Sequence, residues 1–154
     1  MLSRGVSFIG NIAVATKEKP NFSAGSDTSN PINSDHDGCY LLIVDEEYDV
    51  VELIRQLFER DGFQTCIFSN PLSALLHFNS RREDDYNHYH PVIISDIRMP
   101  AMNGYEFIKR VKRLDPNATQ TILMSSLPLK DNEFFNVLPK IKIDQFIQKP
   151  FSRF

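Results

Sequence analysis

From Tyr40 onward, short apolar runs alternate with segments of helical periodicity, and few folds accommodate that order. Apolar runs without polar alternation are typical of strands that are buried on both faces of a parallel sheet. A strand, a helix and a further strand in succession form a right-handed crossover. The pattern therefore predicts an α/β fold built on an open, doubly wound parallel sheet. The predicted strands are 40–44, 64–68, 92–95, 121–125 and 144–148.

Helical spacing and end signals place helices between these strands. Apolar residues recur at three- and four-residue spacing from Val50 onward, and this pattern ends before Gly62. Asn70 and Pro71 are a capping residue followed by a proline at the first helical position, so a second helix begins there. The polar stretch 79–90 is predicted to be a loop. The predicted helices are 50–60, 71–78, 105–114 and 132–138.

The N-terminal part of the chain differs in composition from the rest. Residues 16–38 are rich in Ser, Asn, Asp, Gly and Pro, and carry too little apolar surface to offset the entropy of ordering. Residues 1–38 are therefore expected to be a disordered N-terminal tail. The mostly apolar run from Val6 to Ala15 is interrupted by Gly10 and Asn11, which argues against a secretion signal.

The charge balance argues against one class of partner. The chain has a formal net charge of −3, whereas contacts with nucleic-acid phosphates require clustered Lys and Arg. No apolar run reaches the roughly 20 residues that cross a bilayer. Two cysteines, Cys39 and Cys66, are too few for a disulfide framework. We expect a cytoplasmic protein that binds neither nucleic acid nor a membrane.

Charged and hydroxyl side chains gather at the predicted carboxyl ends of the strands, where open α/β sheets hold their ligands. Carboxylates placed close together repel one another unless a cation lies among them or their pKa values rise. Their oxygens suit Mg²⁺, which keeps several waters and accepts phosphate oxygens. With an ammonium and a hydroxyl, this set suits phosphoryl transfer. The residues at these ends are Asp45, Glu46, Glu47, Asp96, Ser125, Ser126 and Lys149.

Four sequence elements together resemble the response-regulator receiver domain of two-component signalling. They are Asp45-Glu46, the run Asp96-Ile97-Arg98-Met99-Pro100-Ala101-Met102-Asn103-Gly104, Ser125, and Lys149-Pro150-Phe151. The resemblance covers about Cys39 to Phe151 and includes the order and approximate spacing of these elements. It implies a receiver domain at 39–154 with a flavodoxin-like, five-stranded parallel sheet in the order 2-1-3-4-5. It also implies a phosphoacceptor rather than an enzyme.

The resemblance implies a role for each matching residue. Asp96 would accept the phosphoryl group from a sensor histidine kinase or a phosphotransfer protein. Mg²⁺ would be held by Asp45, Glu46, Asp96 and the backbone carbonyl of Arg98. Lys149 and Ser125 would contact the phosphoryl group, with Phe146 rotating inward as Ser125 closes. The loops beside the acceptor would be shaped by Met99, Pro100, Gly104 and Pro150.

Two positions leave alternatives open. The second acid of the pair is usually Asp in the family, and the longer Glu46 can weaken binding of Mg²⁺, which tolerates geometric error poorly. Glu47 is expected to lie too far along the turn to take its place. Spacing alone allows either Ser125 or Ser126 as the hydroxyl. Ser125 is favoured, because the family has a small residue after the hydroxyl and Leu127 follows Ser126.

The sequence stops at Phe154, where receivers continue into a fifth helix for which Ser152 would be the N-cap. The expectation is a receiver domain that is C-terminally truncated and lacks this last helix. One apolar face of the sheet would then need a cover. Three covers are considered: a partner chain, self-association, and the N-terminal run from Val6 to Ala15.

Three functions compete for this set of residues. In the first, phosphorylation of a receiver switches a protein-interaction face. In the second, a degenerate receiver binds proteins without being phosphorylated. Glu46 and the missing helix favour it, while Asp96, Ser125 and Lys149 oppose it. The third, an aspartyl-phosphate hydrolase, needs a general acid two residues after the nucleophile, where this chain has Arg98. The sequence predicts the first function and keeps the second as the alternative.

Overall fold

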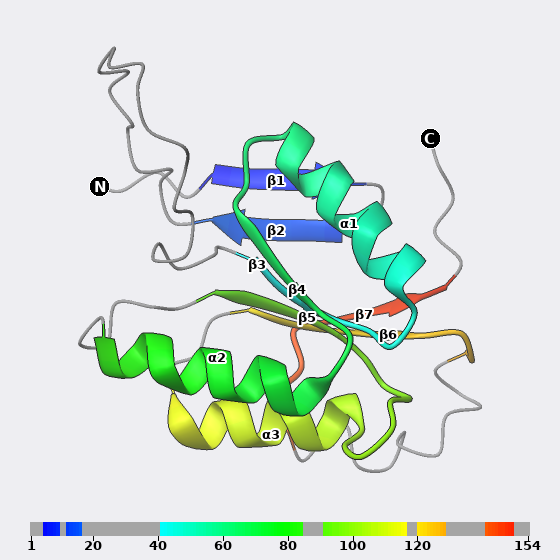
Figure 1. The fold of residues 1–154 in the computed structure, drawn as a ribbon. Helices are drawn as coiled ribbons and strands as arrows, with labels where there is room; N and C mark the ends of the chain where they lie inside the picture. Colours follow the sequence, from blue (N-terminus) through cyan, green and yellow to red (C-terminus); the bar gives the residue numbers. More distant parts are fainter. Residues whose placement is uncertain are drawn as a thin grey trace.

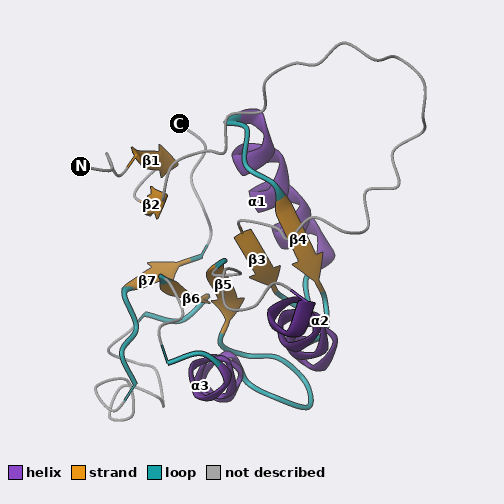
Figure 2. Ribbon diagram, turned by 90° about the vertical axis from the view of Figure 1, so that its left-hand side faces the viewer, coloured by secondary structure: helices purple, strands orange, loops and turns teal. Residues whose placement is uncertain are grey.

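A five-stranded parallel sheet forms the centre of the computed structural model, which describes residues 5–9, 12–16, 41–84, 91–116, 120–128 and 141–149. The strand order β4-β3-β5-β6-β7 confirms the predicted order 2-1-3-4-5; Figure 1 labels the strands and Figure 2 shows their succession. The elements from the first of these strands onward are β3 (Leu41–Val44), α1 (Tyr48–Arg60), β4 (Thr65–Phe68), α2 (Pro71–Asp84), β5 (Val92–Asp96), α3 (Gly104–Leu114), β6 (Thr121–Ser125) and β7 (Gln145–Gln148).

Helices cover both faces of this sheet. α1 lies on one face, and α2 and α3 lie side by side on the other (Figure 2). The central strands β3, β5 and β6 are mostly apolar because alternate residues pack on opposite faces, and helices cover both faces. In β3, Leu41 and Ile43 pack with Ile54 and Phe58 of α1, whereas Leu42 joins the residues beneath α2 and α3. Two apolar layers therefore hold the strands in register and fix where each strand ends.

The second helix is longer than the sequence indicated. α2 continues to Asp84, so the prediction of a loop is wrong for residues 79–84. This last part is polar, but it gains local support: the Asn79 amide donates to Glu83, one helical turn away, at 2.9 Å. Arg82 lies against the ring of Phe78 and 3.8 Å from the buried carboxylate of Asp115, which follows α3. These contacts join the ends of α2 and α3.

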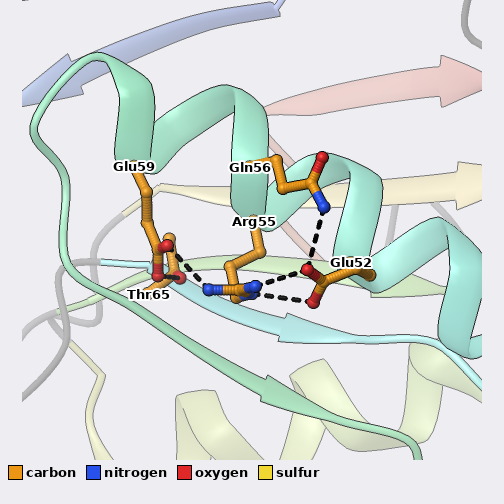
Figure 3. A network of polar contacts seen from close by, with 5 residues as sticks. All are labelled: Glu52, Arg55, Gln56, Glu59 and Thr65. Carbon is orange, nitrogen blue, oxygen red and sulfur yellow. Dashed lines mark hydrogen bonds and ion pairs between the residues drawn. The ribbon is translucent and has the colours of Figure 1, made fainter.

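A polar network fastens α1 to the beginning of β4 (Figure 3). Arg55 pairs with Glu52 and with Glu59, the latter at 2.7 Å, and the Thr65 hydroxyl donates to Glu59 at 2.9 Å. Hydrogen bonds from Arg55 and Gln56 lower the pKa of Glu52 to about 2. Because Thr65 is the first residue of β4, the network links the helix to this edge strand.

The N-terminal segment contains a hairpin that was not predicted. β1 (Gly5–Ile9) and β2 (Ile12–Thr16) pair antiparallel, with Ile9 opposite Ile12, so the expectation of a disordered tail is wrong for these residues. The physical signal is present in the sequence, since Gly10-Asn11 between two β-branched, alternating runs is typical of a two-residue hairpin connection. The hairpin lies on the same side of the five-stranded sheet as α1 (Figures 1 and 2).

The lack of a fifth helix was expected to expose apolar side chains on this side of the sheet. On β6 these side chains are not exposed. Ile122 and Met124 of that strand belong to the cluster beneath α1 and are fully buried. Which of the three proposed covers acts in solution stays a prediction. The predicted helix at 132–138, Pro150 and Ser152 lie outside the described residues. Among the residues that are described, no helix is long and apolar enough to span a membrane.

Candidate functional site

The carboxyl ends of β3, β5, β6 and β7 bring four polar side chains to one edge of the sheet. Asp45 follows β3, Asp96 ends β5, Ser125 ends β6 and Lys149 follows β7. All four are buried, with at most 9% of the residue exposed. The parallel register aligns these strand ends because Val44 pairs with Ser95, Asp96 with Met124, and Ser125 with Gln148. Residues far apart in sequence therefore meet as the prediction required.

The ammonium of Lys149 lies among three carboxylates. Its Nζ is 2.5 Å from Oδ2 of Asp45, 3.0 Å from Oδ1 of Asp96 and 3.3 Å from Oε1 of Glu47. Only Glu47 of these acids is exposed, with 64% of its side chain accessible. A single cation thus neutralises part of a cluster whose charges would otherwise be buried and unpaired.

Burial changes the proton affinity of the two central groups. Burial raises the pKa of the Asp96 carboxyl above its ordinary value, and the hydrogen bond from Lys149 offsets this only in part. Burial alone would lower the pKa of Lys149, but its hydrogen bonds to Asp45 and Asp96 prevail and raise it to about 12. Lys149 is therefore cationic at neutral pH. Ionised Asp96, by contrast, lowers the stability of the folded protein.

Replacing Asp96 with asparagine is expected to stabilise the metal-free protein at pH 7 by about 1 kcal/mol. The pKa of Asp96 is raised in the folded state, so its contribution to stability is greatest below the ordinary value of 3.8 and is lost as the pH rises through the folded value. The stability advantage of Asp96→Asn over the wild type should therefore grow between pH 4 and pH 8. Urea unfolding of both proteins in chelator measures it, and an advantage that shrinks over this range would contradict the assigned burial effect.

A tight turn at the end of β3 orients Asp45 and returns Glu47 to the site. The backbone N–H of Glu47 donates to Oδ1 of Asp45 at 2.9 Å, as in an Asx turn, and Glu47 is the N-cap of α1. The Glu47 side chain reaches Lys149, with Oε1 3.3 Å from Nζ, and the expectation that Glu47 does not replace Glu46 at the metal stays a prediction. Glu46 is exposed and forms no ion pair with any residue that the structure describes.

The loop after Asp96 makes a close approach to that residue. Gly104, the first residue of α3, donates its N–H to the carbonyl of Ile97 at 2.9 Å. A Cβ at Gly104 would lie 1.9 Å from the carbonyl oxygen of Asp96. Asn103 caps α3 by accepting from the N–H of Glu106 at 2.8 Å. Only glycine fits this position, so the residue fixes how closely α3 approaches the acceptor strand.

The same loop contains a strained turn. Ala101 has a φ of 68°, and the N–H of Met102 donates to the carbonyl of Pro100 at 2.8 Å across it. This i to i+2 hydrogen bond with a positive φ is the strained form of the γ-turn. Met99 and Met102 are buried in the cluster beneath α2 and α3, whereas Pro100 is exposed. The two methionines therefore anchor the loop while the turn between them faces outward.

The hydroxyl of Ser125 lies at the end of β6, next to β7, the strand that Lys149 follows. The residue is 2% exposed, and its Oγ accepts a hydrogen bond from the N–H of Leu127 at 3.1 Å. Ser126 is exposed. Phe146, on β7, is half-buried against the cluster beneath α2 and α3. This arrangement supports the preference for Ser125 on grounds of burial, and its contact with a phosphoryl group stays a prediction.

The acidic edge fits a magnesium ion through few protein ligands. Oδ2 of Asp45 is buried, and among the described residues its polar contact is the ammonium of Lys149. Within the described ranges, no three carboxylate, imidazole or thiol groups converge to hold a metal by side chains alone. Two carboxylates and a backbone carbonyl suit Mg²⁺, which commonly keeps several waters in proteins. The donor set is therefore compatible with this ion.

Comparisons with known proteins agree with this geometry. The sequence model of the family described as "response regulator receiver domain" matches residues 41–153. Sporulation initiation phosphotransferase F of Bacillus subtilis is 32% identical over 83 residues, which are 54% of this chain and 61% of that protein. Response regulator SaeR of Staphylococcus aureus is 28% identical over 113 residues, which are 73% of this chain and 45% of that protein. The chain thus spans less than two thirds of either relative.

Solved structures show the same fold. The CheX-CheY-BeF3-Mg²⁺ complex of Borrelia burgdorferi matches with a TM-score of 0.59 at 26% identity, covering 73% of this chain and 78% of that one. The receiver domain of Francisella response regulator 1452 matches with a TM-score of 0.58 at 26% identity, covering 75% and 87%. A CheY-like receiver protein of Methanospirillum hungatei has a TM-score of 0.62 at 21% identity, with coverage of 75% and 85%.

Proposed function

This chain belongs to the response regulator receiver domain family, and from this premise we propose that Asp96 accepts a phosphoryl group in a magnesium-dependent reaction. The observation that carries the proposal is the shared ammonium of Lys149, within 3.0 Å of both Asp45 and Asp96. A carboxylate held beside a fixed cation can take on a phosphoryl group because the cation offsets the added negative charge. Receiver domains of two-component systems serve as phosphoacceptors in general.

In the proposed reaction an oxygen of the Asp96 carboxylate attacks the phosphorus of a phosphohistidine. The new O–P bond forms as the N–P bond breaks, and the imidazole nitrogen of the donor keeps the electron pair. The raised pKa of Asp96 makes its carboxylate more basic than an ordinary one, which favours nucleophilic attack once it is ionised. The chain acts as acceptor rather than as an enzyme with its own substrate.

The metal would be held by Asp45, Asp96 and the backbone carbonyl of Arg98, with Glu46 reaching it directly or through water. When bound, Mg²⁺ neutralises charge on the phosphoryl oxygens. Arg98 suits a backbone role because its N–H also hydrogen-bonds to Asp96, which places the main chain beside the carboxylate. Lys149 supplies the second positive charge and is already directed at the acceptor by its 3.0 Å ion pair.

Phosphorylation would be signalled through the ends of β6 and β7. The Ser125 hydroxyl would turn from the N–H of Leu127 to a phosphoryl oxygen, and the half-buried Phe146 would move inward as that loop shifts. Such a change alters the face formed by these two strands. Receiver domains interact with histidine kinases or phosphotransfer proteins, and we propose one of these as the donor for this chain in the cytoplasm.

Incubation with Mg²⁺ and acetyl phosphate or phosphoramidate, followed by intact-mass measurement, tests the proposal. The wild type should gain the mass of one phosphoryl group, and Asp96→Asn should gain none. Asp49→Asn, at an exposed acid in the first turn of α1, controls for the loss of a nearby charge and should behave like the wild type. No gain by the wild type at high donor concentration would contradict the proposal and favour the degenerate, protein-binding alternative.

A further inference from the structure

Glu47 contacts the site but has no part in the proposed phosphoryl transfer. It follows Asp45 by two residues, and its backbone N–H donates to the Asp45 carboxylate at 2.9 Å. Its side chain then reaches Lys149, with Oε1 3.3 Å from Nζ. A single residue thus orients one partner of the lysine through its main chain and contacts the lysine through its side chain.

The three contacts of Lys149 are not equivalent. An ammonium has three N–H donors, and here three carboxylates lie within 3.3 Å of it. The side chains of Asp45 and Asp96 are 0% and 7% exposed, whereas that of Glu47 is 64% exposed. Water can replace the lysine at an exposed carboxylate, but not at a buried one, so the Glu47 contact is the least costly to exchange.

We propose that Glu47 is a positioning residue, which holds the Lys149 ammonium in the resting protein and competes for it with the incoming phosphoryl group. This inference rests on the proposed function of Asp96. A phosphoryl oxygen bound by Lys149 takes the place of the Glu47 carboxylate, whose contact returns when the group is lost. Glu47 therefore lowers the affinity of the site for a phosphoryl group.

Binding of beryllofluoride, a phosphoryl analogue, at fixed Mg²⁺ concentration tests the competition by fluorine NMR. Glu47→Gln is expected to bind it about two- to fivefold more tightly than the wild type, as follows from the energy of an exposed ion pair. Glu47→Asp keeps the charge but withdraws the carboxylate by one methylene, so its affinity should fall between the two. Asp49→Asn removes an equal charge close by and should bind like the wild type.

A second measurement observes the contact without any ligand. The side-chain NMR signal of the Lys149 ammonium in metal-free protein should shift in Glu47→Gln and Glu47→Asp, and stay unchanged in Asp49→Asn. If all charge-removing variants bind the analogue equally well, the effect is one of long-range charge and the positioning role is overturned. Unchanged binding and an unchanged lysine signal in Glu47→Gln also overturn it. A different outcome would overturn the proposed function itself. If the wild type gains no phosphoryl mass and binds no analogue, Asp96 is not a phosphoacceptor, and the proposed competition fails with it.

Discussion

Replacement of Gly104 by alanine is expected to lower the free energy of unfolding by about 3 kcal/mol, although alanine ordinarily stabilises a helix. The added Cβ would lie 1.9 Å from the carbonyl oxygen of Asp96 and 2.8 Å from the hydroxyl of Ser95. Neither atom can yield freely, because Asp96 is paired within the sheet and the Ser95 hydroxyl donates to the Asp96 carbonyl at 2.9 Å. Chemical denaturation measures the loss.

Gly62→Ala is the matched control for this substitution. Gly62 follows α1 with a φ of 84°, so alanine there introduces backbone strain of about 1 kcal/mol at a position remote from Asp96. Gly104→Ala should be clearly the more destabilised of the two. Its folded fraction should also accept phosphate more slowly, since α3 must move away from the acceptor strand. Equal stabilities for the two variants would contradict the close approach described for Gly104.

Replacement of Lys149 by methionine is expected to lower the free energy of unfolding at pH 7 by about 3 kcal/mol, because two buried carboxylates lose their shared cation. The pKa of Lys149 is about 12 against an ordinary 10.5, so the loss of its own charge removes its contribution only as the pH rises from 10.5 through 12. The defect should shrink toward pH 4, where Asp96, whose pKa is raised, takes up a proton. Urea unfolding of the wild type and of Lys149→Met between pH 4 and pH 7 measures the difference in their free energies of unfolding.

Lys142→Met, at an exposed lysine before β7, controls for the loss of a positive charge and should alter stability by less than about 0.5 kcal/mol.

We also expect Lys149→Met to keep part of its phosphorylation while losing the conformational response. Amide NMR signals of Ser125 and Phe146 with beryllofluoride and Mg²⁺ report on that response. If they shift in this variant as they do in the wild type, the role assigned to Lys149 is wrong.

Most of the sheet could be predicted because its signals are local. Each central strand is a continuous apolar run, and the spacing of polar residues after it marks where the strand ends. The end of α2 could not be predicted this way. Residues 79–84 are polar, and their support comes from Arg82, which packs on Phe78 and approaches Asp115 across the gap to α3. Such a contact is invisible to hydrophobic periodicity.

The sequence predicted those parts of the site that depend only on where the strands end. The sequence pattern indicated parallel strands, whose carboxyl ends lie at one edge of the sheet. For this reason it predicted that Asp45, Asp96 and Lys149 lie close together. The position of Glu47 depends instead on the turn after Asp45. An Asp followed two residues later by a helix N-cap is a signal for an Asx turn, and this signal would have directed Glu47 back to the site.

Among the described residues, the hydrogen bond from the backbone N–H of Lys149 to the carbonyl of Ser125, at 2.8 Å, is the last one that joins the ends of β6 and β7. The residue that carries the ammonium and the residue that carries the hydroxyl are thus tied at their main chains. A displacement of one must be followed by the other, or this hydrogen bond breaks. We therefore expect the two strand ends to move together when phosphate binds, because moving only one of them would cost this hydrogen bond.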